Sequence, residues 1–164
     1  MPTVKLKAIT PQHMPTTAEY LKALKDSVYK TASLVQRDLQ STTRTWEHKP
    51  KFDITITQQG NDYIVTAGTD DKIYGFVDQG TKAHDIKPKR SKYLAFSSGY
   101  RAKTRVGIIG SQPGGAFGET VFASSVHHPG FPGRMFIQRI QKRRQITVQQ
   151  EGSQAIAKVN RTMK

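Results

Sequence analysis

The sequence contains no cysteine among its 164 residues and only five histidines. Without thiols, the chain has no disulfides, thiolate zinc sites, iron–sulfur clusters or cysteine nucleophiles. The histidines are scattered except for the adjacent pair His127 and His128, so candidate metal ligands are few. We therefore expect no cofactor and no resident metal.

Apolar residues are also scarce. They make up 35% of the chain, against about 45–50% in typical globular domains, and no run of them has transmembrane length. Residues 1–10 lack the apolar core of a secretory signal. We expect one soluble domain with no membrane association, acting in the cytoplasm where it is made, with much of its surface polar or facing a partner.

Positive charge is in excess and is unevenly distributed. The chain has 26 Lys+Arg against 12 Asp+Glu, a net charge of +14. Residues 51–80 are net acidic, whereas residues 81–110 carry eight basic groups and one acidic group. This asymmetry favours a basic surface that meets nucleic acid or an acidic protein, with a solvated basic surface as the alternative.

The pattern of the first half predicts a helix followed by a hairpin. Apolar residues recur every three or four positions over 18–40, as on one face of an amphipathic helix, and Thr16 with Glu19 fits a capping box. Alternating apolar and polar residues over 52–57 and 63–67 predict two strands of a hairpin. Residues 1–15 are predicted to be an extended arm that is ordered only against a neighbour.

The second half is predicted to supply more strands and a last helix. Short β-rich runs occupy 73–77, 93–96, 105–109 and 121–126, and helical spacing returns over 134–150. Gly152 is a candidate break, after which residues 151–164 form a tail, either a short helix or loose until bound. The order of elements predicts an α+β fold over 16–150, with a long N-terminal helix packed on an antiparallel β-sheet and a C-terminal helix.

Two turn-rich segments stand out. Gly80 follows an apolar run and suits a positive φ, and Pro88 suits a loop because it has no N–H to donate. Pro129 and Gly130 fit the central positions of a type II turn just before the last helix.

The order of short motifs in residues 74–140 resembles a known family. A run Val-Asp-Gln-Gly-Thr over 77–81 is followed by His-x-Ile-x-Pro-Lys over 84–89, by Leu-Ala-Phe over 94–96, and by Val-x-His-Pro-Gly over 126–130 with Pro132 and an aromatic-bearing helix. This resembles the small neck or tail-completion proteins, often described as minor tail components, that join head and tail in tailed bacteriophages. The stretch 97–120 is longer than the family's usual connection.

The resemblance implies a non-enzymatic virion protein, assembled in the host bacterial cytoplasm. It would form a ring, as a hexamer, between the head-closure protein and the tail terminator or tail tube protein, with the genomic DNA passing through the lumen. A compact domain of this size has a diameter of roughly 40 Å, so six copies would leave an opening wide enough for duplex DNA.

The turns and the basic residues supply the candidate contact sites. The candidate interface residues are Gly80, Thr81, His84, Ile86, Pro88, Lys89, His128, Pro129, Gly130, Pro132 and Phe136. The basic candidates for facing DNA or a partner are Lys82, Lys87, Arg90, Arg101, Lys103, Arg105, Arg139, Lys142, Arg143 and Arg144.

The stretch 97–120 allows two interpretations. It holds six of the thirteen glycines, and its cations Arg101, Lys103 and Arg105 occupy every second position, which in a strand would align them on one face. It is either an extended hairpin that reaches a neighbouring subunit, the tail terminator or DNA phosphates, or a disordered solvated loop.

Catalytic and base-stacking interpretations have less support. Adjacent strand residues such as His127 and His128 point to opposite faces and do not converge on one ion, and His84 with Asp85 lacks the carboxylate cluster that a metal-dependent nuclease needs. Trp46 either stacks on a base or fills the core or an interface. A sequence-independent nucleic-acid-binding protein remains the alternative to the neck protein, and a small nuclease or toxin is the least favoured class.

Overall fold

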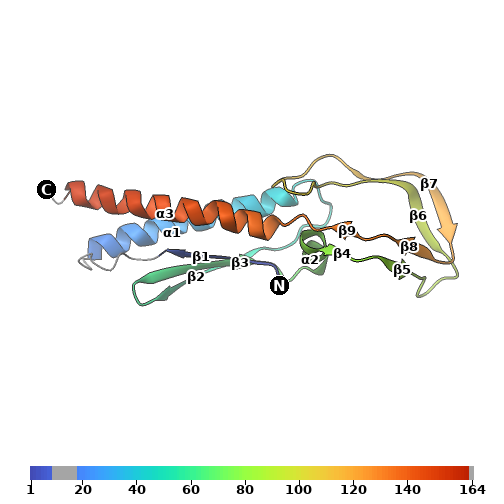
Figure 1. The fold of residues 1–164 in the computed structure, drawn as a ribbon, viewed down its shortest axis with the longest axis horizontal. Coiled ribbons are helices and arrows are strands. Elements are labelled where there is room, and N and C mark those ends of the chain that lie inside the picture. The colour runs from blue at the N-terminus through green and yellow to red at the C-terminus, as the bar shows by residue number, and fades with distance from the viewer. Residues whose placement is uncertain (9–17, 163–164) are drawn as a thin grey trace.

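A computed structural model describes residues 1–8 and 18–162 of the chain. The molecule is elongated, with a helical and sheet body at one end and a β-rich arm at the other (Figure 1). The body contains α1 (Ala18–Thr42), α3 (Phe136–Thr162) and the strands β1 (Thr3–Ala8), β2 (Asp53–Gln59) and β3 (Asp62–Gly68). The fold is α+β with antiparallel sheets, as predicted.

The body sheet has the order β1-β3-β2 and is antiparallel throughout. The predicted hairpin is present as β2 and β3, and Gly60 in the turn has a φ of +61°. The prediction of a separate arm over 1–15 is wrong for its first part, because β1 pairs with β3 and buries Val4, Leu6 and Ala8 in the core. The alternation of apolar and polar residues in this strand explains why one of its faces is buried and the other is open to solvent. Residues 9–15 lie outside the described part of the chain, as does Thr16 of the proposed capping box.

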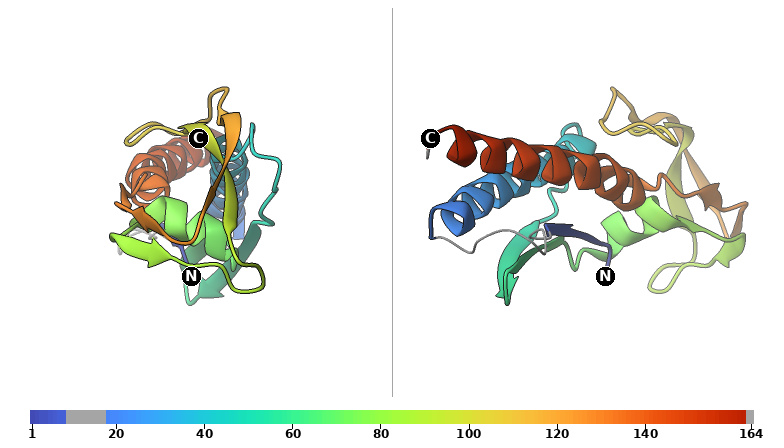
Figure 2. Two further views of the ribbon diagram at one scale, coloured as in Figure 1. Left: turned by 90° about the vertical axis from the view of Figure 1, so that its right-hand side faces the viewer. Right: turned by 60° about the vertical axis from the view of Figure 1, so that its left-hand side comes forward.

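The two long helices lie side by side over one face of this sheet (Figures 1 and 2). The predicted apolar face of α1 is buried, with Val28, Val35 and Leu39 inaccessible to solvent. Helix α3 does not break at Gly152 but continues to Thr162, so the predicted separate tail over 151–164 belongs to the helix as far as that residue. Gly152 is buried, and a side-chain carbon there would lie 3.5 Å from Leu24 of α1, so the glycine belongs to the helix packing.

A short helix joins the body to the arm. Residues 73–77, predicted as a strand, lie within the helix α2 (Lys72–Gln79), whose first turn is capped by the Asp71 carboxylate accepting from the Tyr74 N–H. A short apolar run has no decisive period, and here the cap and the packing of Tyr74 select the helix. Tyr74 is fully buried, and Trp46, Phe52 and Phe136 surround its ring. Of the two interpretations of Trp46, the structure therefore places it against the core.

The arm consists of three short antiparallel strand pairs that leave the body in succession (Figure 1). These are β4 (Gly80–Thr81) with β9 (Phe131–Pro132), β5 (His84–Ile86) with β8 (Val126–His128), and β6 (Leu94–Arg101) with β7 (Gly115–Ala123). Residues 97–101 and 115–120 of the stretch 97–120 thus lie in paired strands, as the hairpin interpretation predicted, whereas residues 102–114 form a connection without helix or strand. The predicted strand over 105–109 is absent, since these residues lie in the connection 102–114 between β6 and β7.

That connection folds back onto the body. The Ser111 Oγ accepts from the Thr45 N–H at 3.1 Å, and the Gln112 carbonyl accepts from the Thr45 hydroxyl at 3.2 Å, just beyond the end of α1. The predicted alignment of three cations along a strand is therefore wrong, because only Arg101 lies in β6.

Candidate subunit interface

Gly80 and Gly130 let two chain segments meet at the base of the arm. Gly80 has a φ of +83°, which confirms the predicted positive φ, and a side-chain carbon there would lie 2.5 Å from the Gly133 nitrogen. Gly130 has a φ of +79°, and a side-chain carbon there would lie 2.3 Å from the Thr81 carbonyl oxygen. Such distances leave no room for a side chain, so backbone packs on backbone where β4 meets β9. The two segments are therefore closely packed at the point where the arm leaves the body. The predicted type II turn is wrong, because residues 129–130 connect β8 to β9 in the same direction along the arm, and the chain does not reverse there.

Asp78 joins the end of α2 to the start of α3. Its carboxylate accepts a hydrogen bond from the Ile137 N–H at 3.1 Å, and its carbonyl accepts one from the Met135 N–H at 2.9 Å. Burial raises the pKa of Asp78, while the hydrogen bonds from the N–H groups of Ile137 and Phe136 oppose that rise. A carboxylate at the first turn of a helix satisfies N–H groups that have no partner within the helix. Asp78 thus fixes the root of the arm to the body.

The histidines of the arm occupy both faces of one strand pair. His84 and His128 are directly opposite in β5 and β8, and their rings stack with centroids 5.2 Å apart. His84 Nδ1 donates to the Lys82 carbonyl at 2.8 Å, and His128 Nδ1 accepts from the Gly130 N–H at 3.0 Å.

On the other face, His127 Nδ1 lies 2.7 Å from an Asp85 carboxylate oxygen. His127 and His128 therefore point to opposite faces, as predicted, and Asp85 pairs with His127 rather than with His84. In the described residues, no group of three or more histidines, cysteines or carboxylates is arranged to hold a metal ion.

Ten of the eleven candidate interface residues lie in the arm. They occupy the strands β4, β5, β8 and β9 and the turns beside them, and Ile86 is 38% exposed. Phe136 is the exception. It is fully buried against Tyr74, with ring centroids 5.9 Å apart, and so its prediction as an interface residue is wrong.

The predicted basic residues fall into two separate groups. Lys87, Lys89 and Arg90 are exposed in the turn between β5 and β6, at the far end of the arm. Lys82 is exposed between β4 and β5, in the part of the arm formed by the pairs β4–β9 and β5–β8, which we call the stalk. Arg139, Lys142 and Arg143 are exposed on α3, and the Arg139 guanidinium lies beside Gly107 of the connection 102–114. Arg101 and Arg105 are exposed near this connection, and Lys103 is half-buried, with its Nζ 3.5 Å from a Glu47 carboxylate oxygen.

Arg144 contradicts its prediction as a residue facing DNA or a partner. Its side chain is 8% exposed and points into the body, where it donates two hydrogen bonds to the Asp38 carboxylate at 2.7 and 2.8 Å. Both groups are buried between α1 and α3, so Arg144 is a structural residue. Its basic charge alone grouped it with the exposed Arg139 and Arg143, whereas its spacing of four residues from the buried Ile140 places it on the buried face of α3.

The apolar surface of the arm was not predicted from the sequence. Phe117, Phe122 and Tyr100 in β6 and β7 are 59%, 68% and 72% exposed. An alternating strand pattern normally means that one face is buried. Nothing in the sequence therefore indicated that both faces of this hairpin are exposed. Each of these rings is available to a partner.

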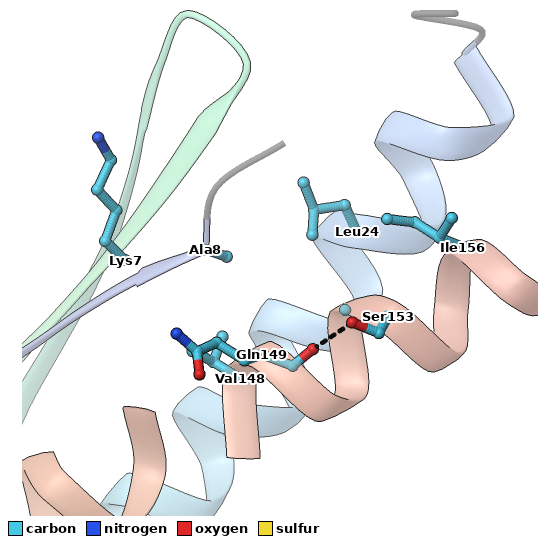
Figure 3. A pocket seen from close by; sticks show the side chains of 8 residues that line it. Lys7, Ala8, Leu24, Val148, Gln149, Ser153 and Ile156 are labelled. Carbon is cyan, nitrogen blue, oxygen red and sulfur yellow. Dashed lines mark hydrogen bonds between the residues drawn. The ribbon is translucent and has the colours of Figure 1, made fainter. Parts of the chain in front are cut away.

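The body offers a small hollow between β1, α1 and α3, with a volume of about 230 Å³ (Figure 3). Its described lining is mostly apolar, including Leu24, Val148 and Ile156, and Lys7 is its single titratable group. The Ser153 hydroxyl on its wall already donates to the Gln149 carbonyl. The described residues that line the hollow do not include a nucleophile paired with a general base.

Within residues 1–8 and 18–162, none of the helices has the length and apolarity needed to span a membrane. Comparisons with family models, with curated proteins and with solved structures found no match to this chain.

Proposed function

We propose that the chain is a structural subunit that joins head and tail of a tailed bacteriophage, without catalytic activity. It assembles into a ring in the neck, between the head-closure protein and the tail terminator or tail tube protein. One observation carries the proposal. Most of the motifs that resemble neck and tail-completion proteins come together in the two strand pairs β4–β9 and β5–β8, although Leu-Ala-Phe over 94–96 lies in β6.

The geometry of that unit suits subunit contacts better than chemistry. Glycines allow close backbone packing at the base of the arm, Asp78 ties it to α3, and exposed aromatic side chains lie along its outer half. Large exposed apolar surfaces are typical of protein interfaces. A mechanism based on shape and charge complementarity follows from this arrangement.

The ring is proposed as a hexamer around the DNA channel, in the virion. Six copies bring a net charge of about 84, which would act on a polyanion even if only part of it faced the lumen. Native mass spectrometry of isolated necks tests the copy number, and a mass corresponding to another number of subunits would replace the hexamer.

The joining role is tested by stopping the reading frame early in the source phage. Lysates are scored by electron microscopy for joined particles, and a wild-type copy supplied in trans serves as the control. Filled heads separate from tails, with joining restored by the control, are the expected result. Normal numbers of joined, infectious particles without the protein would refute the proposal.

A second candidate function, sequence-independent nucleic-acid binding, is favoured by the exposed cations on α3. It predicts tight binding of the isolated chain to duplex DNA, with an affinity that falls steeply with salt. Replacing Lys142 and Arg143 by Gln would then lower the slope of log affinity against log salt by about one for each phosphate that the variant no longer binds. The neck subunit, by contrast, binds free DNA weakly, because its cations are spread over a ring.

A further inference from the structure

The hairpin β6–β7 is a two-stranded ribbon that nothing in the described chain covers. Its two strands pair only with each other, and neither packs extensively on another helix or strand. An isolated two-stranded ribbon is at best marginally stable in water, because it has no second layer against which to bury a face. The ribbon therefore requires a partner.

Apolar side chains occupy both faces of this ribbon. On the first face, Phe96 lies directly opposite Val121, and Tyr100 follows Phe96 at a spacing of four residues. On the second face, Phe122 is opposite Ala95 and Phe117 is opposite Gly99. The ring of Phe117 lies over Gly99, which has no side chain to displace it.

A β-bulge creates the second face. Phe117 and Phe122 are five positions apart, and regular alternation would place them on opposite faces. The register shifts between the pairs Ser97–Thr120 and Gly99–Phe117, so β7 carries one extra residue, and Gly118 there has a φ of +87°. A bulge of this kind changes the side to which the following residues point. The result is a second aromatic face, with its two rings 59% and 68% exposed.

The charge of the ribbon indicates what kind of partner fits it. Within β6 and β7 the charged residues are Arg101 and Glu119, which cancel. Nucleic acid requires several cations on the contact surface, and these lie elsewhere in the arm. The ribbon instead suits an apolar, uncharged protein surface, and an identical ribbon is such a surface, free of net repulsion.

We propose that each β6–β7 ribbon packs between the ribbons of two further copies of this chain, with its first face against the second face of a neighbour. A two-fold symmetric contact would cover one face and leave the other in water, whereas a head-to-tail contact covers both and can close into a ring. This inference rests on the proposed ring and identifies the surface that holds its subunits together.

Variants of each face test the contact in the full-length chain. The first-face variant carries Phe96→Ser and Tyr100→Ser, and the second-face variant carries Phe117→Ser and Phe122→Ser. A control variant carries Tyr29→Ser and Ile146→Ser, which removes two side chains that are 52% and 53% exposed on α1 and α3. Circular dichroism of all three checks that the fold is retained, and native mass spectrometry reads the assembly.

The expected results follow from the head-to-tail geometry. Wild type and control form oligomers larger than dimers, and each face variant alone is monomeric. A mixture of the two face variants forms a dimer and nothing larger, because one intact first face remains for one intact second face. Face variants that assemble like wild type, or a wild-type chain that stays monomeric at all concentrations, would overturn the inference.

Cysteine cross-linking gives an independent readout, since the chain has no cysteine of its own. In a variant with Phe96→Cys and Phe122→Cys the two thiols lie on opposite faces, so they cannot join within one ribbon. Oxidation, or a short bismaleimide, is expected to give a ladder of dimers, trimers and larger species. Cross-linking of Phe96→Cys alone into dimers would instead show a symmetric contact and overturn the inference.

These outcomes separate the inference from the proposed function. If the phage lacking the protein yields unjoined heads and tails, and the wild-type chain forms rings that the face variants leave intact, the joining role stands and the ribbon contact fails. If joined particles form normally, the joining role fails, whatever the ribbons do.

Discussion

The buried ion pair between Asp38 and Arg144 allows a direct test of how α1 and α3 are held together in the body. The Asp38 carboxylate is 9% exposed and the Arg144 side chain 8%, and the guanidinium donates to both carboxylate oxygens. Replacing Arg144 by Ala removes the donors and leaves a carboxylate between α1 and α3 without its cation. We expect the variant to be much less stable than wild type.

The magnitude follows from the cost of an uncompensated buried charge. Breaking a buried pair by removing one partner costs about 3–5 kcal/mol of unfolding free energy. For a domain of this size, 1 kcal/mol corresponds to about 2–4 °C in Tm, so the melting temperature is expected to fall by about 6–20 °C. Replacing both partners by apolar residues, Asp38→Leu with Arg144→Met, should recover most of the loss.

Urea unfolding of wild type, Asp38→Leu, Arg144→Met and the double variant measures the coupling in one thermodynamic cycle, and Arg144→Ala is measured beside it. Arg143→Ala is the matched control, because Arg143 is the neighbouring arginine on the exposed side of α3 and its removal should change stability by less than about 0.5 kcal/mol. If Arg144→Ala were no less stable than the control, the buried pair would be refuted. A loss of DNA binding without a loss of stability would restore the exposed role predicted from the sequence.

Gly80→Val should lower the unfolding free energy by at least about 1 kcal/mol and impair assembly, because the residue has positive φ and its side chain would meet the Gly133 backbone. Urea unfolding measures the stability and native mass spectrometry the assembly, and unchanged values of both would refute the backbone assignment. Burial opposes ionisation of Asp71, but hydrogen bonds from His48 and from the Tyr74 N–H lower its pKa below the ordinary value of 3.8. The carboxylate therefore contributes stability above that pH and loses it as the pH falls, so Asp71→Ala should cost about 1 kcal/mol at pH 7 and less at pH 3; an equal loss at both pH values in urea unfolding would contradict this. Tyr74→Ala should cost about 3–5 kcal/mol because the ring is fully buried, and a thermal melt with an unchanged midpoint would show that the aromatic cluster does not hold the helices together.

Local patterns predicted the regular parts of the body. The spacing of Leu24, Val28 and Val35 is that of one helix face, and the alternation around Gly60 is that of a hairpin, because each pattern reports which side of its own element is apolar. The positive φ at Gly80 was likewise predicted, although the residue follows the helix α2 and not the strand that the sequence suggested. The candidate interface residues were chosen from the glycine- and proline-rich segments around it and around Pro129.

The other features depend on contacts between segments far apart in the sequence. Residues 3–8 were predicted to be an arm, but they pair with the edge of β3. Residues 73–77 were predicted to be a strand, but the aromatic rings around Tyr74 pack against it in a helix. Arg144 shares the helix face of the buried Ile140 and Val148, and what the local sequence does not reveal is its partner Asp38, 106 residues away, which compensates the buried charge.

The aromatic faces of the arm show most clearly which features local sequence predicts and which depend on the folded structure. Composition and local pattern are enough to show that residues 94–123 hold β-forming residues, glycines and few charges. A bulge, however, is a property of two paired strands, since the extra residue exists only relative to the partner's register. Strand pairing in the folded chain therefore places Phe117 and Phe122 on one face and leaves apolar surface exposed on both sides of the ribbon.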